Sequence, residues 1–489
     1  MAYLGWLLVG LLAGAAASFL FFRWISAMKK QTTCTPSSMS PISKQLFDHF
    51  HSTPIEEITI VERRFPFRMR ADIQRAIDRG IVDGSTDEAF FGVGQEYQHG
   101  AMTLSGCLMP SSHNSITARP PVFEEVEIGE AAPMRVLKNG LWLIEREGVR
   151  LAVLLAPTNG YDGPLSIQIE VAIPKKDNLH VVKAFFASLE AAMHEAASYR
   201  GKILSLESNN SYDGTSSGIK VHRLQSVERE QVILPEKTLA LLDRNVIQFV
   251  QQRPRLAQLQ QSTKKGLLFY GPPGTGKTHT IHYLAKSLPG HTTFLITAEQ
   301  VGLLSDYMTL ARLLQPSIVV MEDVDLIARD RNEMGSPCEE VLLNKLLNEM
   351  DGLTEKADIL FLLTTNRPES LEAALASRPG RIDQAIEFPA PDEVGRAKLI
   401  KLYSKGMDLQ PELISHIAGR TEGVSAAFIK ELMRRTVQFH LEHNQGSEIT
   451  QRDVYAALDE MLFSGGTLNL KLLGTSQAIR NGTCAERCN

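Results

Sequence analysis

The sequence predicts an α/β protein in which a parallel sheet flanked by helices precedes a small helical region. Apolar strand-like segments alternate with helical ones in the second half of the chain, which is typical of a doubly wound parallel sheet. After about residue 395 every periodic segment is helical. The expected strands are residues 266–270, 292–296, 317–322 and 359–365, and the expected late helices are 394–403, 412–418, 426–444 and 450–461.

The composition is that of an ordinary globular protein. The 489 residues are enough for two or three domains, and 43% are hydrophobic and 22% charged. A net charge of −5 without a long basic run disfavours nucleic acid as the main partner. Five scattered cysteines without metal-like spacing indicate a reducing compartment.

The N-terminus is apolar and long enough to cross a bilayer. No residue of the segment 3–22 is charged, and Arg23, Lys29 and Lys30 follow it directly. The positive-inside rule then places the bulk of the chain on the cytoplasmic or matrix side. The alternative is a cleaved signal peptide, which carries its positive charge before the apolar run. We therefore favour a transmembrane helix within residues 1–30.

The remaining chain divides by composition and periodicity. Residues 31–44 are rich in Ser, Thr and Pro and indicate a linker. In the mixed α/β region that follows, Asn139-Gly140 predicts a hairpin between two strands, and no residue pattern points to chemistry. We interpret this region as a recognition domain for a substrate or partner. The predicted parts are an anchor (1–30), a linker (31–44), an α/β N-terminal domain (45–225), a large α/β subdomain (226–395), a small helical lid (396–462) and a flexible tail (463–489).

A glycine-rich loop directly follows the first strand of the predicted parallel sheet. It matches the P-loop pattern G-x-x-x-x-G-K-[ST], whose backbone N–H groups surround phosphates. Lys277 can neutralise phosphate charge, and the Thr278 hydroxyl can bind Mg²⁺. The loop therefore predicts a nucleoside triphosphate site. Its residues are Gly271, Pro272, Pro273, Gly274, Thr275, Gly276, Lys277 and Thr278.

Polar residues end the two later strands. Glu322 and Asp323 follow an apolar run, which suits a Mg²⁺ partner and a base that activates water, although adjacent acids also occur at solvated sheet edges. Asn366 ends the next strand and can position the attacking water, unless it only forms a turn. Arg378 and Arg381 lie three apart on a predicted turn. They are either surface charges or arginine fingers that reach the nucleotide of a neighbouring subunit.

Five motifs together resemble the AAA ATPases: GPPGTGKT, MEDVD, EMDGL, TTNRPESLEAAL and SRPGRID. They occur in that family's order and approximate spacing, and the resemblance covers about residues 226–462. It implies a P-loop AAA module that hydrolyses ATP with Mg²⁺. It also implies a homo-oligomeric ring, usually a hexamer, in which the next subunit completes each site.

The resemblance assigns roles to individual residues. Lys277 and Thr278 match the phosphate and Mg²⁺ ligands, and Asn366 matches the residue called sensor 1. Arg378 and Arg381 match the two arginine fingers. Two further segments have counterparts: Asp351-Gly352-Leu353 resembles the intersubunit signalling motif, and residues 423–427 resemble the stretch that opens a lid helix near the adenosine.

The order of the two acids departs from the usual family pattern. Most members read Asp-Glu where this chain reads Glu322-Asp323. Glu322 would then face Mg²⁺, and Asp323 would be the catalytic base. The same order occurs in the membrane-anchored type that translocates the Rieske iron–sulfur protein in mitochondria. That type also has one transmembrane helix, a middle domain and one AAA module, so this chain resembles it in architecture.

The usual threading loop is also missing. Residues 297–314 contain no aromatic–hydrophobic–glycine triplet. Tyr307 either grips a protein chain or packs within a helix, and we favour packing. The sequence has no His-Glu-x-x-His motif, which argues against a fused zinc protease.

These observations predict a membrane-anchored ATPase that remodels or translocates an unknown protein client, as a chaperone does. The alternative is a nucleotide-controlled oligomeric scaffold or switch with slow hydrolysis, which the reversed acids and the missing triplet favour. A nucleic-acid motor is a third hypothesis, which the net acidity and the anchor disfavour.

Overall fold

The computed structural model describes residues 40–82, 86–95, 102–109, 116–160, 163–175, 178–195, 197–207, 218–327, 345–346, 348–353, 356–370, 381–443 and 446–464. The chain forms two compact units. The first joins Met1–Glu124 with Val136–Ala192, and the second joins Glu125–Arg135 with Met193–Asn489. The expected anchor over 3–22 and the tail beyond 464 lie outside the described residues. Within the described residues, no helix combines the length and apolarity that a bilayer crossing requires.

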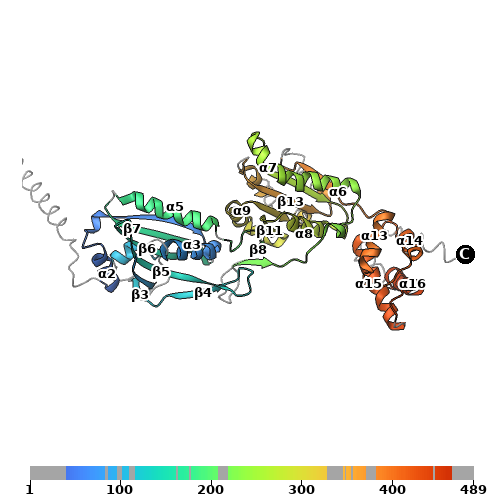
Figure 1. Cartoon of the computed structure of the whole chain (residues 1–489), viewed down its shortest axis with the longest axis horizontal. Coiled ribbons are helices and arrows are strands. Elements are labelled where there is room, and N and C mark those ends of the chain that lie inside the picture. The colour runs from blue at the N-terminus through green and yellow to red at the C-terminus, as the bar shows by residue number, and fades with distance from the viewer. Residues whose placement is uncertain are drawn as a thin grey trace, which may run out of the picture. The chain divides into compact units, whose positions relative to one another are not determined.

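The first unit is built on an antiparallel sheet, which gives the predicted α/β N-terminal domain its architecture. Its strand order is β1-β7-β6-β5-β2-β3, and β4 also pairs with β5 (Figure 1). The strands are β1 (Ile58–Pro66), β2 (Thr86–Gln95), β3 (Ile116–Arg119), β4 (Val122–Val126), β5 (Met134–Arg146), β6 (Val149–Gly160) and β7 (Gly163–Pro174). The helices are α2 (Pro41–His49), α3 (Arg70–Val82), α4 (Leu104–Leu108) and α5 (Leu179–Glu195).

Helix α2 begins inside the predicted linker. Ser40 is its N-cap and accepts a hydrogen bond from the Ser43 N–H, while Pro41 occupies the first helical position. Ile42 and Leu46 then bury their side chains against one face of the sheet. Ser and Pro therefore mark a helix start here, and residues 41–44 are helical where a linker was predicted.

The predicted hairpin at Asn139-Gly140 is wrong, because β5 runs through both residues as one strand. Gly140 meets a packing requirement instead. A Cβ there would lie 2.7 Å from Leu137 Cδ2 and 2.9 Å from Phe90 Cε2. The β5–β6 turn lies at Glu147-Gly148, where both residues have positive φ, 56° and 74°. This matches the backbone that a type I′ turn needs, but with Glu in place of the usual Asn or Asp.

The second unit contains a seven-stranded sheet in the order β14-β10-β13-β12-β11-β8-β9. Its strands from β14 to β8 pair in parallel, and β9 closes the edge antiparallel to β8. This confirms the predicted parallel sheet. The strands are β8 (Ile203–Leu206), β9 (Ile219–His222), β10 (Lys265–Tyr270), β11 (Thr292–Ile296), β12 (Ser317–Met321), β13 (Ile359–Thr365) and β14 (Gln384–Glu387).

Helices cover both faces of this sheet. One face, with Ile318 and Leu360, packs under α8 through Ile281 and Leu284. On the other face, α9 contacts β11 and β12 and buries Met308 completely. The helices are α6 (Glu236–Leu242), α7 (Phe249–Gln258), α8 (Lys277–Ser287), α9 (Leu304–Leu313) and α10 (Val324–Ile327), with a π-helical turn, Asp243–Gln248, between α6 and α7.

Strands β8 and β9 lie within the region that was predicted to form the N-terminal domain. They extend the second sheet beyond β11, which differs from the predicted boundary at residue 225. Side chains from the segment after β11 hold them there. The Leu206 N–H donates to Tyr307 Oη (2.8 Å), and Gln300 Nε2 donates to the Leu206 carbonyl (3.0 Å). Tyr307 is fully buried, so the prediction that it packs is confirmed.

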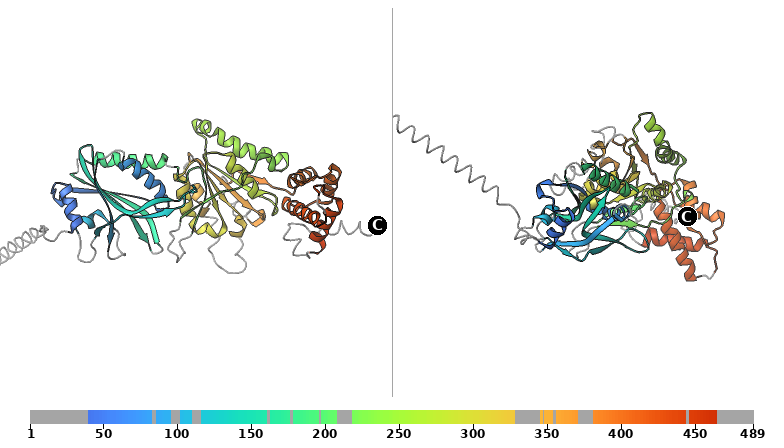
Figure 2. Two further views of the ribbon diagram at one scale, coloured as in Figure 1. Left: turned by 60° about the horizontal axis from the view of Figure 1, so that its bottom comes forward. Right: turned by 60° about the vertical axis from the view of Figure 1, so that its left-hand side comes forward.

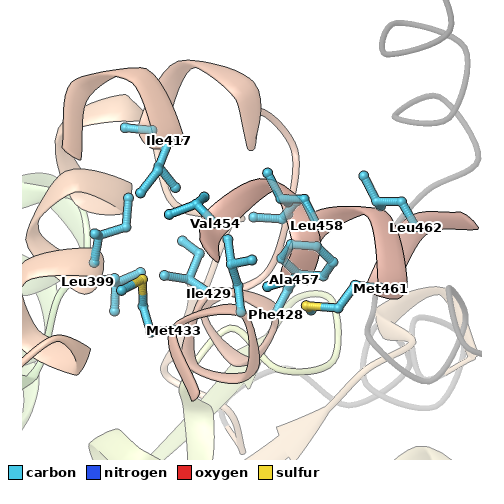
Figure 3. Packing of buried hydrophobic residues seen from close by; sticks show 14 of the residues in the cluster. Leu399, Ile417, Phe428, Ile429, Met433, Val454, Ala457, Leu458, Met461 and Leu462 are labelled. Carbon is cyan, nitrogen blue, oxygen red and sulfur yellow. The ribbon is translucent and has the colours of Figure 1, made fainter. Parts of the chain in front are cut away.

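The predicted helical lid is a bundle of four helices with its own core (Figure 2). The helices are α13 (Glu393–Tyr403), α14 (Pro411–Arg420), α15 (Ala426–His443) and α16 (Gln451–Asp459). Apolar side chains from all four point toward one another in Figure 3, among them Leu399, Ile417, Phe428 and Val454. Thr450, the first residue of the helix predicted over 450–461, is the N-cap and forms a capping box with Asp453 at the start of α16.

Candidate functional site: a nucleotide pocket at the carboxyl edge of the parallel sheet

The predicted site residues gather because their strands are neighbours. Strand β13 lies between β10 and β12, and all three run parallel. Their carboxyl ends therefore meet at one edge, where ligands bind in open α/β sheets. The P-loop follows β10, the two acids follow β12, and Asn366 follows β13.

The P-loop turns back on itself before α8. Gly276 caps this helix with φ of 98°, a conformation that costs glycine little. Lys277 Nζ donates to the carbonyls of Gly271 (2.8 Å) and Pro272 (2.9 Å), which keeps the loop closed around the ammonium. Burial lowers the pKa of Lys277 to about 8, against the opposing effect of Asp323 and Asp325. A bound phosphate would favour the charged form of this lysine.

The two predicted Mg²⁺ ligands lie side by side. Thr278 Oγ1 donates to Glu322 Oε1 across 2.8 Å. Mg²⁺ holds oxygen ligands at about 2.0–2.1 Å in octahedral geometry, which puts neighbouring ligands about 2.9 Å apart. The spacing of these oxygens fits that ion without a backbone change. When bound, Mg²⁺ would neutralise charge on the β- and γ-phosphates.

The predicted base and the predicted sensor contact each other. Asn366 Nδ2 donates to Asp323 Oδ1 (2.8 Å), and the Asp323 N–H donates to Thr364 Oγ1 (2.9 Å). Asp323 has φ of 49°, a left-handed conformation that Asp adopts more readily than most residues. The carboxylate is thus held at the sheet edge, where it can accept a proton from water. Its assignment as the base stays a prediction.

Sequence reasoning missed Asp325. Its side chain is 2% exposed and accepts hydrogen bonds from Thr365 Oγ1 (2.9 Å) and the Asn366 N–H (3.1 Å). Asp325 therefore fixes the end of β13, from which the Asn366 side chain extends. The signal was the third acid in MEDVD, just inside the short helix α10, because a buried acid two residues beyond a site needs partners.

Arg381 lies away from its own P-loop, and Arg378 lies outside the described residues. The Arg381 guanidinium pairs with Asp351, the first residue of the expected signalling motif. Its backbone borders Gly266 at the start of β10, whereas the P-loop follows the end of that strand. Six strand residues span roughly 17 Å. Arg381 is thus poorly placed to act on the nucleotide of its own subunit, and the finger roles of both arginines stay predictions.

The lid closes the pocket. The Ala427 N–H at the start of α15 donates to the Gly274 carbonyl (3.0 Å). A Cβ at Gly274 would lie 2.9 Å from Ala427 Cβ, so this close approach requires glycine. The cavity between them has a volume of about 410 Å³. Its walls come from residues 231–234, the P-loop, Asp323, Thr364, Asn366 and the lid residues Leu399, Tyr403, Ala426, Ala427 and Lys430.

Comparison with known families agrees with this geometry. The profile of the ATPase family associated with various cellular activities (AAA) matches residues 267–390. That range begins in β10 and ends after β14, so it spans the P-loop, both acids and Asn366. The matched segment is the part of the chain that builds the phosphate side of the pocket.

Individual relatives extend the similarity beyond this segment. The 26S proteasome regulatory subunit 8 homolog of Naegleria fowleri is 30% identical over 328 residues, which are 63% of this chain and 75% of that protein. The proteasome-activating nucleotidase of Methanocaldococcus jannaschii is 33% identical over 237 residues, 45% of this chain and 54% of the relative.

A third relative carries a different activity in its name. The ATP-dependent zinc metalloprotease FtsH 3 of Symbiobacterium thermophilum is 33% identical over 236 residues, 45% of this chain and only 37% of the relative. The matches thus cover between 37% and 75% of the length of these relatives. These similarities and the nucleotide pocket show that the chain belongs to the AAA family and is an ATP hydrolase.

Proposed function

We propose that this protein uses ATP hydrolysis in a homo-oligomeric ring, a hexamer by family resemblance, to remodel or translocate a protein client at a membrane. Residues 3–22 anchor it, with the ATPase on the cytoplasmic or matrix side. By its sequence motifs the architecture resembles that of the membrane-anchored Rieske-translocase type. Nucleic acid is not the client, in keeping with the net charge of −5.

The observation that best supports hydrolysis is the cluster of polar groups at one edge of the sheet. Thr278 and Glu322 are spaced for Mg²⁺, and Asn366 orients the Asp323 carboxylate. A base that is held by a second side chain can activate water without further rearrangement. A passive nucleotide-binding scaffold has no need for this second contact.

The proposal of a protein client draws on the relatives and on the first unit. The relatives are named for proteasome regulation, proteasome activation and proteolysis, all of which concern proteins. In this chain an antiparallel sheet precedes the ATPase module. We assign the recognition of the client to that unit, in agreement with its lack of a catalytic motif.

A nucleotide-controlled scaffold is the second candidate. The segment after β11, where threading enzymes carry their gripping triplet, is tied to β8 by Gln300 and Tyr307. The Tyr307 hydroxyl also donates to the Leu295 carbonyl (3.1 Å), so the Tyr307 side chain cannot grip a client protein. Remodelling by this protein therefore does not use Tyr307.

A substrate trap tests the function. Asp323→Asn should bind ATP and lose turnover by about 100-fold or more, because the amide cannot accept the proton of the attacking water. Cross-linking of the full-length trap in cells, followed by mass spectrometry, should capture one protein client together with ATP. The trap should fractionate with membranes, and a chain that begins at residue 31 should not.

The wild-type protein and Asp323→Ala provide the controls. Wild-type ATPase activity should rise with unfolded or client protein and stay unchanged with single-stranded DNA. Stimulation by DNA would favour the nucleic-acid motor, and a trap that captures only copies of itself would favour the scaffold. Full hydrolysis by both variants would refute the role of Asp323.

A further inference from the structure

One face of α8 holds the segment that forms a wall of the nucleotide pocket. His279, Tyr283 and Lys286 are spaced four and three residues apart, so they lie along one side of the helix. Each contacts residues 226–231. The helix begins at Lys277 and Thr278, the last two residues of the P-loop, so the phosphate site and this face share one helix.

Two of these contacts lie at the outer part of the segment. Lys286 Nζ donates to Ser226 Oγ and pairs with Glu228. The Arg229 guanidinium lies 5.8 Å from the centre of the Tyr283 ring. The Lys286 and Glu228 side chains are both about half exposed, and exposed ion pairs stabilise a structure only weakly. The contact nearest to the pocket is therefore the one that decides where the wall lies.

That contact is between His279 and Gln231. His279 Nε2 lies 3.2 Å from the Gln231 carbonyl oxygen, which can only accept, so Nε2 carries the proton and donates. The Gln231 side chain is engaged elsewhere, because its Oε1 accepts from the Glu228 N–H (2.8 Å). Among the described residues, the His279 side chain is the hydrogen-bond donor to this carbonyl.

The residues that follow Gln231 line the cavity. Val232, Ile233 and Leu234 form part of its wall, and His279 lines it as well. Ile233 packs against the lid core, and Leu234 packs against the sheet core. The wall thus lies between the lid core and the sheet core. Its position along α8 depends on the contact of Gln231 with His279.

We propose that His279 is a positioning residue for nucleotide binding, which holds the 231–234 wall against the nucleoside part of ATP through its bond to Gln231. The phosphates contact the N-terminus of α8, and the nucleoside contacts the wall that the flank of the same helix holds. Loss of the bond lets the wall move without moving the P-loop. This inference rests on ATP hydrolysis and is independent of the client, the ring size and the membrane.

The test separates the nucleoside part from the phosphates. In the full chain, His279→Leu should raise KM for ATP about tenfold, the order expected from one lost hydrogen bond, and change kcat less than twofold. Binding of ADP should weaken by a similar factor. Binding of inorganic tripolyphosphate, which has no nucleoside, should stay within twofold of the wild type.

Two further variants give the controls. His279→Gln keeps an N–H donor and should restore KM to within about twofold of the wild type. His416→Leu changes an exposed histidine of the lid and should leave KM unchanged. An unchanged KM in His279→Leu would overturn the proposal. So would an equal loss of tripolyphosphate binding, which would mean that the substitution displaces the P-loop, or a Gln variant as weak as the Leu variant.

Discussion

At the residue scale, the reversed acids each have a partner that suits their length. Glu322 has the longer side chain and reaches the Thr278 hydroxyl on α8. Asp323 has the shorter side chain and meets Asn366, which directly follows the adjacent strand β13; the Asp323 backbone is in the left-handed region. Such conformations are retained where the surroundings impose them, as at active sites. The order Glu-Asp is thus compatible with both predicted roles.

Asp325 provides the residue-scale prediction. Asp325→Ala should lower kcat by roughly tenfold or more, because the Asn366 backbone and the Thr365 hydroxyl lose their buried acceptor and Asn366 shifts. Steady-state ATPase kinetics measure the effect. Asp325→Asn keeps an acceptor oxygen and should retain most of the activity. Equal kcat in the wild type and Asp325→Ala would show that the end of β13 needs no such support.

At the element scale, the lid has a buried histidine between two acceptors. His440 on α15 is 1% exposed, with Nδ1 3.1 Å from Asp453 Oδ2 and Nε2 2.8 Å from the Gly446 carbonyl. A neutral imidazole has one N–H and can satisfy only one of them. The Gly446 carbonyl, and then Asp453, raise the pKa of His440 above its usual value. Asp453 also accepts from the Thr450 N–H (2.9 Å), which ties the charge to the start of α16.

The lid should therefore be more stable at acid pH than at alkaline pH. A raised folded pKa contributes stability that is complete below the unfolded value, near 6.5, and is lost as pH rises through the folded value. Hydrogen exchange of α15 and α16 amides in the full chain, corrected for intrinsic rates, should show more protection at pH 6 than at pH 8.5. His440→Gln should remove this difference. A wild-type profile as flat as that of the variant would contradict the charged pair.

At the scale of the whole molecule, the separation of Arg381 from its own P-loop favours a site that two subunits share. Its partner Asp351 lies at the end of a helical segment, and Gly266 lies beside its backbone at the amino end of β10. The second unit thus presents the nucleotide at one end of its strands and the arginine at the other. A ring allows the two ends of neighbouring copies to meet.

Mixed rings test the shared site. Asp323→Asn and Arg378→Ala should each lack ATPase activity alone and recover part of it when co-expressed. The reason is that some interfaces then join an intact Asp323 to an intact Arg378. ATPase activity per subunit is the measurement, with Asp323→Asn plus Lys277→Met as the matched pair that cannot recover, because both changes lie in the same half-site. Full activity of a monomer would refute the shared site.

Much of the fold could be predicted because local patterns carry it. The run Ile359–Leu363 is continuously apolar, as expected of a strand covered on both faces, and the predicted ends of the strand match those of β13. The P-loop could be predicted for the same reason, since its glycines, Lys277 and Thr278 are consecutive. The helix start at Thr450 could also be predicted, because a capping box involves residues only three positions apart in the chain.

Features that depend on distant partners could not be predicted. Gly140 follows Asn139 as in a hairpin, yet it lies within β5 because Leu137 and Phe90 occupy the space beside it. The join of β8 to β11 depends on Tyr307, about 100 positions away, and nothing local to Ile203–Leu206 indicates it.

The sequence by itself determined the chemistry of the site, because residue type and spacing limit what a P-loop and two strand-end acids can bind. Only the tertiary structure decided which groups meet: Glu322 with Thr278, Asp323 with Asn366, and Arg381 with Asp351. The physical reason is that a parallel sheet reorders its strands. The neighbours of β10 come from segments about 90 and 120 residues further along the chain, and no local pattern specifies that order.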